Sequence, residues 1–455
     1  MIRHTFKDEL LNISENTTIF AANETKDKSM ERAAISELYE WKSRPGRKPL
    51  IVRGARQVGK TWLILDFAKK AYKQYVYVNF EEDDFLNHVF ENDFNIDRII
   101  TAISIRTQKD IDTDTLLIFD EIQAAPRGVT SLKYFCEKAR EYHVIAAGSL
   151  LGIAMHRSDS FPVGKVDFVD LSPLNFNEFL LAMGENRIAE LTAGGDWKMM
   201  GMVKDRLTTL LKTYYYVGGM PEVVDSYRQR KNFAEVRRIQ NTILDTYNND
   251  FSKHAPINEV PRIRMVWNSI AGQLAKENRK FIYGMLHEGA RAKDFEVAIE
   301  WLKDAGLIYK VNRTKSGELP LNAFEDFNTF KIYLLDVGLL SAVNKLTADT
   351  LIMGNEIFNT YKGALTEQYF FQQIRDKVDF VYYWSADNSR GEIDFVVQKG
   401  DKVIPIEIKA EENLRAKSLA AFVARYPQLH ALRFSLSDYR EQEWMTNIPL
   451  YAPVL

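Results

Sequence analysis

One octapeptide limits the possible folds of this chain more than any other feature. Residues 54–61 read Gly-Ala-Arg-Gln-Val-Gly-Lys-Thr and fit the pattern G-x-x-x-x-G-K-[ST] at every position. An apolar run, PLIVR, precedes the octapeptide, and a helical pattern, TWLILDFAKKAY, follows it. A strand, a glycine-rich turn and a helix in this order are the setting in which the pattern surrounds a phosphate group.

The residue types in the octapeptide explain how it would hold a nucleotide. Glycines let backbone N–H groups turn inward around phosphate oxygens, while the helix N-terminus adds positive potential. Lys60 can reach the β- and γ-phosphates, and the Thr61 hydroxyl can bind Mg²⁺. A chance glycine-rich loop is the alternative. We therefore expect ATP and Mg²⁺ as cofactors, with these nucleotide-binding residues: Gly54, Ala55, Arg56, Gln57, Val58, Gly59, Lys60, Thr61 and Trp62.

Acidic residues at the end of a second apolar run would supply the other half of this site. The segment LLIFDE covers residues 116–121. Asp120 is the candidate ligand of Mg²⁺, often through water, and Glu121 is the candidate base that orients and deprotonates the attacking water. The alternative is that two adjacent carboxylates merely end a solvated strand.

Short apolar runs alternate with helical patterns through the first 171 residues. We predict strands at 49–53, 75–80, 116–119, 143–147 and 166–171, which indicates a parallel α/β sheet. The run 75–80 lies between the two motifs along the chain and favours the hydrolytic ATPase branch of P-loop folds. The run 143–147 ends at Gly148-Ser149, so Ser149 is the candidate sensor of the γ-phosphate, with a simple turn serine as the alternative.

Composition excludes several other classes of protein. The chain has 60 Lys and Arg against 62 Asp and Glu, so bulk positive charge does not hold nucleic acid. Its one cysteine, Cys136, excludes an internal disulfide and a cysteine-rich zinc site, and favours a reducing, cytoplasmic location. The charged N-terminus lacks a signal-peptide pattern, and the longest apolar stretch, 144–155, is too short to span a membrane.

Several segments together resemble a prokaryotic AAA-type ATPase family. They are RKPLIVRGARQVGKT, LLIFDEIQAAP, VIAAGSLLGIA, SFPVGKVDFVDLSPLNFNEFL, the GG-x-P segment at 218–221, and FKIYLLDVGLL at 330–340. The resemblance implies an ATPase core, a winged helix and a C-terminal fold like the PD-(D/E)XK nucleases. It also implies that Gly218, Gly219 and Pro221 form a lid turn near the adenine, with inter-helix punctuation as the alternative. Lys165, Arg56 and Arg127 are basic candidates, and none is clearly the arginine finger.

The segment 255–325 is the predicted winged helix. It contains 11 Lys and Arg and 9 Asp and Glu, a net charge of +2. Residues 299–311 predict a recognition-type helix, a glycine turn and a first wing strand, and 313–317 would form the wing tip that grips phosphates. Because the excess of positive charge is small, docking to a protein remains open beside contact with DNA.

A second constellation of charged residues lies near the C-terminus. A helix is predicted at 366–374, and strands are predicted at 380–384, 392–398 and 402–409. Glu407 and Lys409 are two apart in the last of these strands and share a face, and Asp394 lies on the strand before it. This D…E-x-K arrangement can hold a divalent metal on a scissile phosphate, with Lys409 stabilising charge. In the resemblance, Glu367 takes the place of the helix carboxylate, and a second divalent metal is implied. A solvated hairpin face is the alternative.

The sequence thus predicts a multidomain α/β protein: a P-loop parallel αβα sandwich of the ASCE/AAA type with a helical lid, a winged helix and a restriction-endonuclease-like region. The expected units are 1–30, 31–195, 196–254, 255–325 and 326–455. The first hypothesis is an ATP-hydrolysing protein that acts on or is regulated by nucleic acid. The second is a nucleotide-dependent switch whose C-terminal fold docks partners, and a weaker third is a remodeller of proteins. DNA, a protein partner and a homo-oligomer stay open as partners besides ATP.

Overall fold

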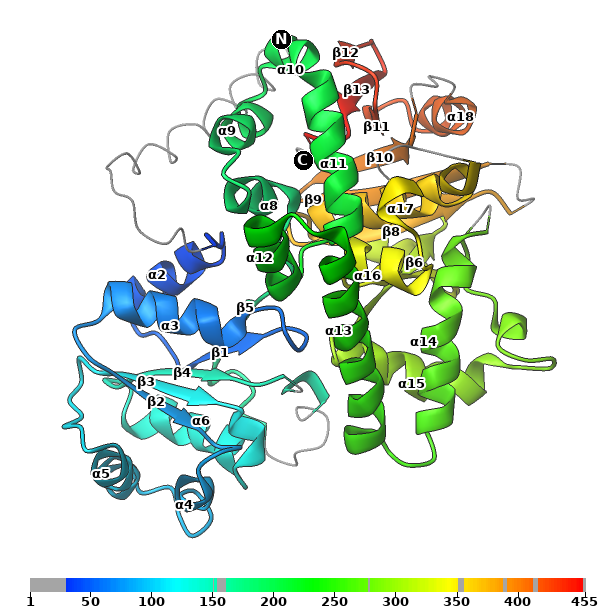
Figure 1. The fold of residues 1–455 in the computed structure, drawn as a ribbon. Coiled ribbons are helices and arrows are strands. Elements are labelled where there is room, and N and C mark those ends of the chain that lie inside the picture. The colour runs from blue at the N-terminus through cyan, green and yellow to red at the C-terminus, as the bar shows by residue number, and fades with distance from the viewer. Residues whose placement is uncertain are drawn as a thin grey trace.

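The computed structural model describes residues 30–149, 151–153, 161–276, 279–350, 356–387, 391–411 and 416–452, without the side chains of 356–360. The predicted lead-in, 1–30, lies almost entirely outside this part. The described elements form two sheets joined by a helical segment (Figure 1). Within the described residues, no helix is both long enough and apolar enough to cross a membrane.

The first sheet has five parallel strands in the order β2-β3-β4-β1-β5. Its strands are β1 (Leu50–Arg53), β2 (Tyr75–Asn79), β3 (Leu116–Asp120), β4 (His143–Ala147) and β5 (Asp167–Asp170). The predicted parallel α/β sheet is therefore confirmed. In space, β4 rather than β2 lies between the strands that carry the two phosphate motifs, because β2 pairs on the far side of β3.

Apolar side chains point to both faces of this sheet, which explains why helices cover both. Leu50 and Val52 enter one apolar core and Ile51 enters another, since successive strand residues point to opposite faces. Figure 1 shows α2 and α3 on one face and α4, α5 and α6 on the other. The bounds of these helices are α2 (Ile35–Ser43), α3 (Lys60–Ala71), α4 (Asp84–Asn87), α5 (Ile96–Thr107) and α6 (Gly128–Lys138).

A helical segment follows β5 and leads to the second sheet. Its helices are α8 (Phe176–Ala182), α9 (Asn186–Gly194), α10 (Trp197–Met202), α11 (Lys204–Val217), α12 (Pro221–Arg230), α13 (Phe233–His254), α14 (Val260–Leu274) and α15 (Ala292–Asp304). The turn between α11 and α12 holds the GG-x-P segment. Pro221 is the first residue of α12, where its fixed φ and missing N–H cost the helix nothing.

The second sheet is mixed and has eight strands in the order β12-β13-β11-β10-β9-β8-β6-β7. The strands are β6 (Ile308–Thr314), β7 (Glu325–Leu334), β8 (Phe380–Ser385), β9 (Glu392–Lys399), β10 (Lys402–Ile408), β11 (Ala431–Ser435), β12 (Arg440–Glu441) and β13 (Met445–Pro449). Among the described residues, the helices in this part are α16 (Val337–Val343), α17 (Glu356–Ile374) and α18 (Lys417–Arg425). Because β6 also pairs with β8, the sheet runs across the unit boundary expected at 325/326.

Most of the segment expected as the wing tip, residues 313–317, packs against the rest of the fold, although Lys315 is exposed. Residues 308–314 and 325–334 do form an antiparallel pair, but the tip of the pair is covered. Thr314 is fully buried and Ser316 is 8% exposed. Arg313 donates from Nε to the carbonyl of Ser385 at 3.1 Å and ion-pairs with Asp387. Residues 313 and 314 therefore connect β6 to β8. Because Arg313 is already paired with Asp387, it is not free to bind a phosphate.

Candidate nucleotide site and a C-terminal carboxylate cluster

The phosphate loop has a backbone that only its glycines allow. Gly54 has a φ of +150°, and a Cβ there would lie 2.3 Å from the carbonyl oxygen of Leu171. Gly59 has a φ of +92° and precedes the first residue of α3. The loop between them therefore curls over the N-terminus of α3, where backbone N–H groups are unpaired and attract anions.

Lys60 lies folded over this loop. Its Nζ donates to the carbonyl oxygens of Gly54 and Ala55, each at 2.9 Å, and the residue is 7% exposed. Burial lowers the pKa of Lys60 to about 8, against the opposing effect of Glu121 and Asp120. A phosphate bound in the loop would favour the charged ammonium and so reverse this shift.

Thr61 and Asp120 meet although 59 positions separate them. The Thr61 hydroxyl donates to Asp120 Oδ2 at 2.7 Å, and the Tyr77 hydroxyl donates to the same oxygen at 2.9 Å. Asp120 ends β3 and is 4% exposed. A hydroxyl beside a carboxylate, both facing a phosphate loop, is an oxygen donor set that suits Mg²⁺. Tyr77 was missed by sequence reasoning, although its place in β2, next to β3, follows from the sheet.

Glu121 and Ser149 also lie in contact. Ser149 donates to Glu121 Oε2 from both its backbone N and its Oγ, at 3.2 Å each. Glu121 adopts a φ of +48°, which is uncommon outside glycine, and Gln123 donates to the same Oε2. A Cβ at Gly148 would lie 1.9 Å from the side chain of Gln123. The carboxylate of Glu121 is thus held by three donors at the carboxyl edge of the sheet.

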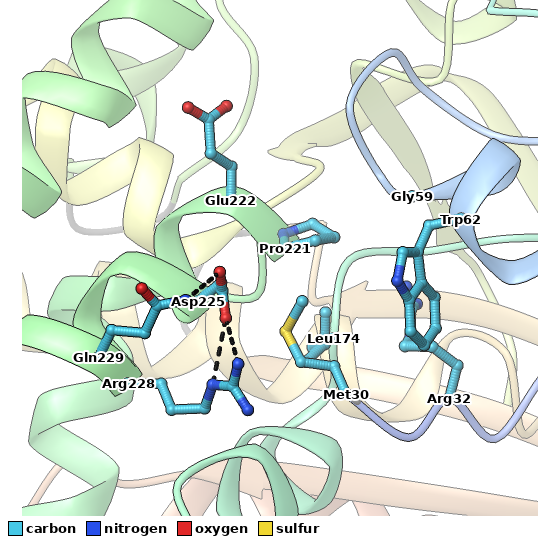
Figure 2. Close-up of a pocket in the computed structure, with 10 residues that line it drawn as sticks. All are labelled: Met30, Arg32, Gly59, Trp62, Leu174, Pro221, Glu222, Asp225, Arg228 and Gln229. Carbon is cyan, nitrogen blue, oxygen red and sulfur yellow. Dashed lines mark hydrogen bonds and ion pairs between the residues drawn. The ribbon is translucent and has the colours of Figure 1, made fainter. Parts of the chain in front are cut away.

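A pocket of about 440 Å³ opens beside the loop (Figure 2). Figure 2 shows Trp62 and Arg32 on one side and the polar residues of α12 on the other. Gly59, Trp62 and Pro221 were predicted to bind nucleotide and line this pocket. The other lining residues were not predicted: Met30, Arg32, Leu174, Glu222, Asp225, Arg228 and Gln229.

Gly219 lies behind the pocket rather than in its lining. Leu174 donates its N–H to the Gly219 carbonyl at 2.7 Å, and the Gly219 N–H donates to Asp336 Oδ2 at 2.7 Å. A Cβ at Gly219 would lie 2.0 Å from the Leu174 carbonyl oxygen. Asp336 is fully buried and also accepts from Gln372 of α17 at 3.2 Å. The lid turn is therefore bonded directly to the part of the chain that carries the second sheet.

Arg32 ties three segments together at the edge of the pocket. Its guanidinium donates to the carbonyl of Val58 at 3.0 Å, to the carbonyl of Ser172 at 2.5 Å and to Glu178 at 3.2 Å. The side chain is 4% exposed. Arg32 could not be predicted from the sequence, because it lies outside every motif and its partners are 26 to 146 positions away.

The three basic residues raised as candidates have other partners. Arg56 ion-pairs with Asp250 of α13 at 2.6 Å, and Tyr247 of the same helix donates to the Arg56 carbonyl at 2.9 Å. Arg127 donates to the Glu91 carbonyl at 2.6 Å. Lys165 ion-pairs with Glu137 at 2.9 Å. Arg56 alone lies in the phosphate loop, and its ion pair links that loop to α13.

The predicted C-terminal residues lie in a network of ion pairs. Glu367 of α17 is fully buried; its Oε1 accepts from Lys331 at 2.9 Å and from Tyr333 at 2.5 Å. Arg279 donates to the other oxygen, Oε2, of Glu367. These cations hold the pKa of Glu367 below its usual value although burial alone would raise it. Neither Arg279 nor Lys331 was predicted.

Asp394, Glu407 and Lys409 lie beside this network. Asp394 Oδ2 accepts from the Ile408 N–H at 2.7 Å, and Asp394 Oδ1 is 3.7 Å from Arg279 Nη1. Burial, followed by the charge of Glu367, raises the pKa of Asp394 to about 7. Lys409 Nζ is 2.6 Å from Glu407 Oε1. In the described part of the chain, no three His, Cys, Asp or Glu residues are grouped to hold a metal ion, so a second metal gains no support here.

Three parts of the chain match known families. Residues 46–180 match the family described as an AAA domain, and 208–350 and 362–452 match two domains of unknown function, DUF8612 and DUF4143. Residues 46–180, which hold the phosphate loop and Asp120, are thus similar to AAA domains. No curated protein matches the chain.

Solved structures with a likeness to the chain are remote. A Walker-type ATPase of Pyrococcus abyssi is 13% identical, with a TM-score of 0.45, over 71% of this chain and 99% of that one. The Aeropyrum pernix ORC1 protein in complex with DNA is 13% identical, with a TM-score of 0.28, over 70% and 93%. Drosophila ORC bound to DNA is 10% identical, with a TM-score of 0.25, over 75% and 100%.

Proposed function

We propose that the chain binds MgATP in the phosphate loop and hydrolyses it. The observation that carries this proposal is the meeting of two pairs at one sheet edge: Thr61 with Asp120, and Glu121 with Ser149. Lys60 neutralises the β- and γ-phosphates, and Thr61 and Asp120 hold Mg²⁺, which adds positive charge at the same oxygens when bound. The base and ribose occupy the pocket between Trp62 and Pro221.

In the proposed reaction, Glu121 acts as general base. A water oxygen bonds to the γ-phosphorus, Glu121 takes the proton of that water, and the bond from the γ-phosphorus to the β–γ bridging oxygen breaks to release ADP and phosphate. Ser149 donates to Glu121 in the free protein. We propose that Ser149 turns to the γ-phosphate when ATP binds, which frees Glu121 to accept the water.

We also propose that the nucleotide state acts on the second sheet. Gly219, two residues before Pro221 of the pocket, bonds to Asp336, and Asp336 bonds to Gln372 on α17. Glu367 lies on the same helix as Gln372. A change in the lid turn therefore has a direct route of buried hydrogen bonds to α17, the helix that carries Glu367.

Two uses of the second sheet are candidates. The D…E-x-K spacing of Asp394, Glu407 and Lys409 along the sequence is typical of metal-dependent action on nucleic acid, which favours the first hypothesis. The ion pairs around Glu367 and the covered tip at Thr314 favour the second, a nucleotide-dependent switch that docks a protein partner or a second copy of the chain.

One experiment tests the ATPase proposal and separates these uses. ATP turnover is measured with Mg²⁺, alone and with single-stranded DNA, double-stranded DNA or RNA, for the wild type, Lys60→Ala and Lys69→Ala. Lys69 is exposed on the same helix and is the control. We expect Lys60→Ala to lose nucleotide binding and turnover while Lys69→Ala keeps both. Turnover by Lys60→Ala at the wild-type rate would refute the proposal. Stimulation by one nucleic acid supports the first use, and equal rates with all of them support the switch.

A further inference from the structure

The carboxylate cluster of the second sheet already contains a cation supplied by the chain itself. The guanidinium of Arg279 donates to Glu367 Oε2 and lies 3.7 Å from Asp394 Oδ1. Its side chain is 20% exposed, whereas the side chain of Glu367 is 1% exposed. One arginine thus bridges Asp394, which sequence analysis assigned to a divalent metal, and Glu367, the helix carboxylate of the resemblance.

The fold makes room for this guanidinium. A Cβ at Gly363, one turn before Glu367 on α17, would lie 2.6 Å from Arg279 Nη2. Arg279 also adopts a φ of +49°, which costs energy for a residue with a Cβ and persists only where surrounding contacts enforce it. The missing Cβ at Gly363 leaves a notch for the guanidinium, and the positive φ of Arg279 directs the chain toward it. Both features favour the contact between Arg279 and Glu367.

One oxygen of a second carboxylate in the cluster has no hydrogen-bond partner in the described part of the chain, although Lys409 Nζ pairs with the other oxygen at 2.6 Å. Glu407 is 7% exposed, and its Oε2 has no hydrogen-bond partner among the described residues. Ile406 pairs with Phe395 in the β9–β10 ladder, so the next pair in that register brings Glu407 opposite Asp394 on the same face. A buried carboxylate oxygen without a donor is costly, and a cation beside Asp394 would remove that cost.

We propose that Arg279 is an internal cation that occupies this carboxylate cluster, and that a divalent metal binds at Asp394 and Glu407 only when the guanidinium leaves. The proposal rests on the nuclease-like reading of the second sheet and adds its regulation. Both cations need the charge of Asp394, so they compete for one position. Lys331 continues to neutralise Glu367 after Arg279 leaves, since Lys331 Nζ lies 2.9 Å from Glu367 Oε1.

Binding of Mn²⁺ to nucleotide-free protein, followed by the electron paramagnetic resonance signal of free Mn²⁺, tests this proposal. Arg279→Gln removes the charge. Gly363→Ala leaves every charge in place and pushes the guanidinium out of its notch, and alanine within a helix favours the fold. Gly272→Ala, in the last turn of α14, is the matched control, because a Cβ there meets nothing within 4 Å.

We expect Arg279→Gln and Gly363→Ala to bind Mn²⁺ at least about tenfold more tightly than the wild type and Gly272→Ala. Adding Asp394→Asn to either variant should return the affinity to the wild-type value. Equal Mn²⁺ affinity in the wild type and both variants, whether strong or absent, would overturn the proposal, as would a gain that survives Asp394→Asn.

The same proteins separate this result from the proposed functions. ATP turnover of Arg279→Gln and Gly363→Ala reports on the phosphate loop, and incubation with linear and supercoiled DNA reports on cleavage. A gain in Mn²⁺ affinity without DNA cleavage supports competition by Arg279 and refutes a nuclease. No gain in Mn²⁺ affinity with normal ATP turnover overturns the role of Arg279 and leaves the ATPase proposal intact.

Discussion

Arg32 shows how a single side chain outside any motif can shape the nucleotide site. It holds the carbonyl of Val58 inside the phosphate loop and pairs with Glu178, which also accepts from the backbone N–H groups of Ala33 and Asn175. Because all three nitrogens of the guanidinium are used, lysine cannot replace these contacts. The geometry of the loop therefore depends on a residue 22 positions before it.

Arg32→Ala should destabilise the protein by about 3 kcal/mol, since removing one partner leaves Glu178 buried and short of its cation. Affinity for ATP should fall as well, because the Val58 carbonyl loses its donor. Urea unfolding and titration with a fluorescent ATP analogue measure the two effects. Arg44→Ala is the control, as Arg44 is 53% exposed and makes a longer ion pair of 3.6 Å. Equal stability of the two variants would contradict this role for Arg32.

His143 makes the first sheet sensitive to acid. Its Nδ1 contacts the Tyr72 hydroxyl at 2.5 Å, and burial, with Arg47 and Lys42 nearby, lowers the pKa of His143 to about 4 from 6.5. Between pH 6.5 and 4, His143 is therefore protonated in the unfolded chain but remains neutral in the folded chain. The contribution of His143 to stability is complete above pH 6.5 and is lost as the pH falls through this window.

His143→Gln removes this titration, so the stability advantage of the wild type over the variant should shrink as the pH falls from 7 to 4. Urea unfolding at several pH values measures the difference in the free energy of unfolding between the two proteins. The carboxylates titrate in both proteins, so their effect cancels in this difference. A gap that stays constant across this range would show that His143 does not carry the acid sensitivity.

At the scale of elements, local pattern predicted the strands that have a continuous apolar run. The predicted strand 143–147 is β4 residue for residue, and the strand at 380–384 differs from β8 by one residue. β13 was missed because Thr446, Asn447 and Pro449 interrupt its apolar pattern; it is a strand because β11 pairs with it. α17 begins ten residues before the predicted helix, since Gly363 and a weak pattern hid its first turns.

The two charged sites differ in how far the sequence could predict them. Lys60, Thr61, Asp120, Glu121 and Ser149 follow strand ends of one parallel sheet, so topology alone brings them together. Arg279, Lys331 and Tyr333 reach Glu367 from 34 to 88 positions away along the chain. No spacing rule links residues so far apart, and the ion-pair network could therefore not be predicted from the sequence.

Asp336 is the joint between the lid turn and α17. Its carboxylate accepts from three donors: Gly219 N–H and Gln372 Nε2 bond to Oδ2, and Leu339 N–H bonds to Oδ1. Asparagine at this position would replace one acceptor oxygen with an NH₂ group, which cannot accept a hydrogen bond and would face one of these donors. Asp336→Asn should therefore cost about 1–3 kcal/mol of stability.

The variant should also weaken the effect of ATP on α17. Hydrogen exchange of α17 with and without ATP measures this effect, and urea unfolding measures the stability. Asp401→Asn, in the exposed turn between β9 and β10, is the control. An unchanged response of α17 in Asp336→Asn would contradict the proposed route from the lid turn.

At the scale of the whole molecule, the parts of the chain share packing more than the sequence suggested. One apolar core contains Leu38 and Trp41 beside the first sheet as well as Phe395 and Phe434 in the second. The AAA domain was predicted as a separate unit, yet α13 contacts its phosphate loop and Gln373 of α17 accepts from Phe176 at its edge. The phosphate loop is therefore in direct contact with a helix that lies far along the chain.

The most direct test of the ATPase account is the split between binding and turnover in Glu121→Gln. Glutamine keeps the shape of Glu121 but cannot take a proton, so ATP should bind as in the wild type while Mg²⁺-dependent turnover falls by at least about 100-fold. Glu141→Gln, an exposed change close to β4, should leave both unchanged. Wild-type turnover by Glu121→Gln would contradict the central claim that this carboxylate activates water for ATP hydrolysis.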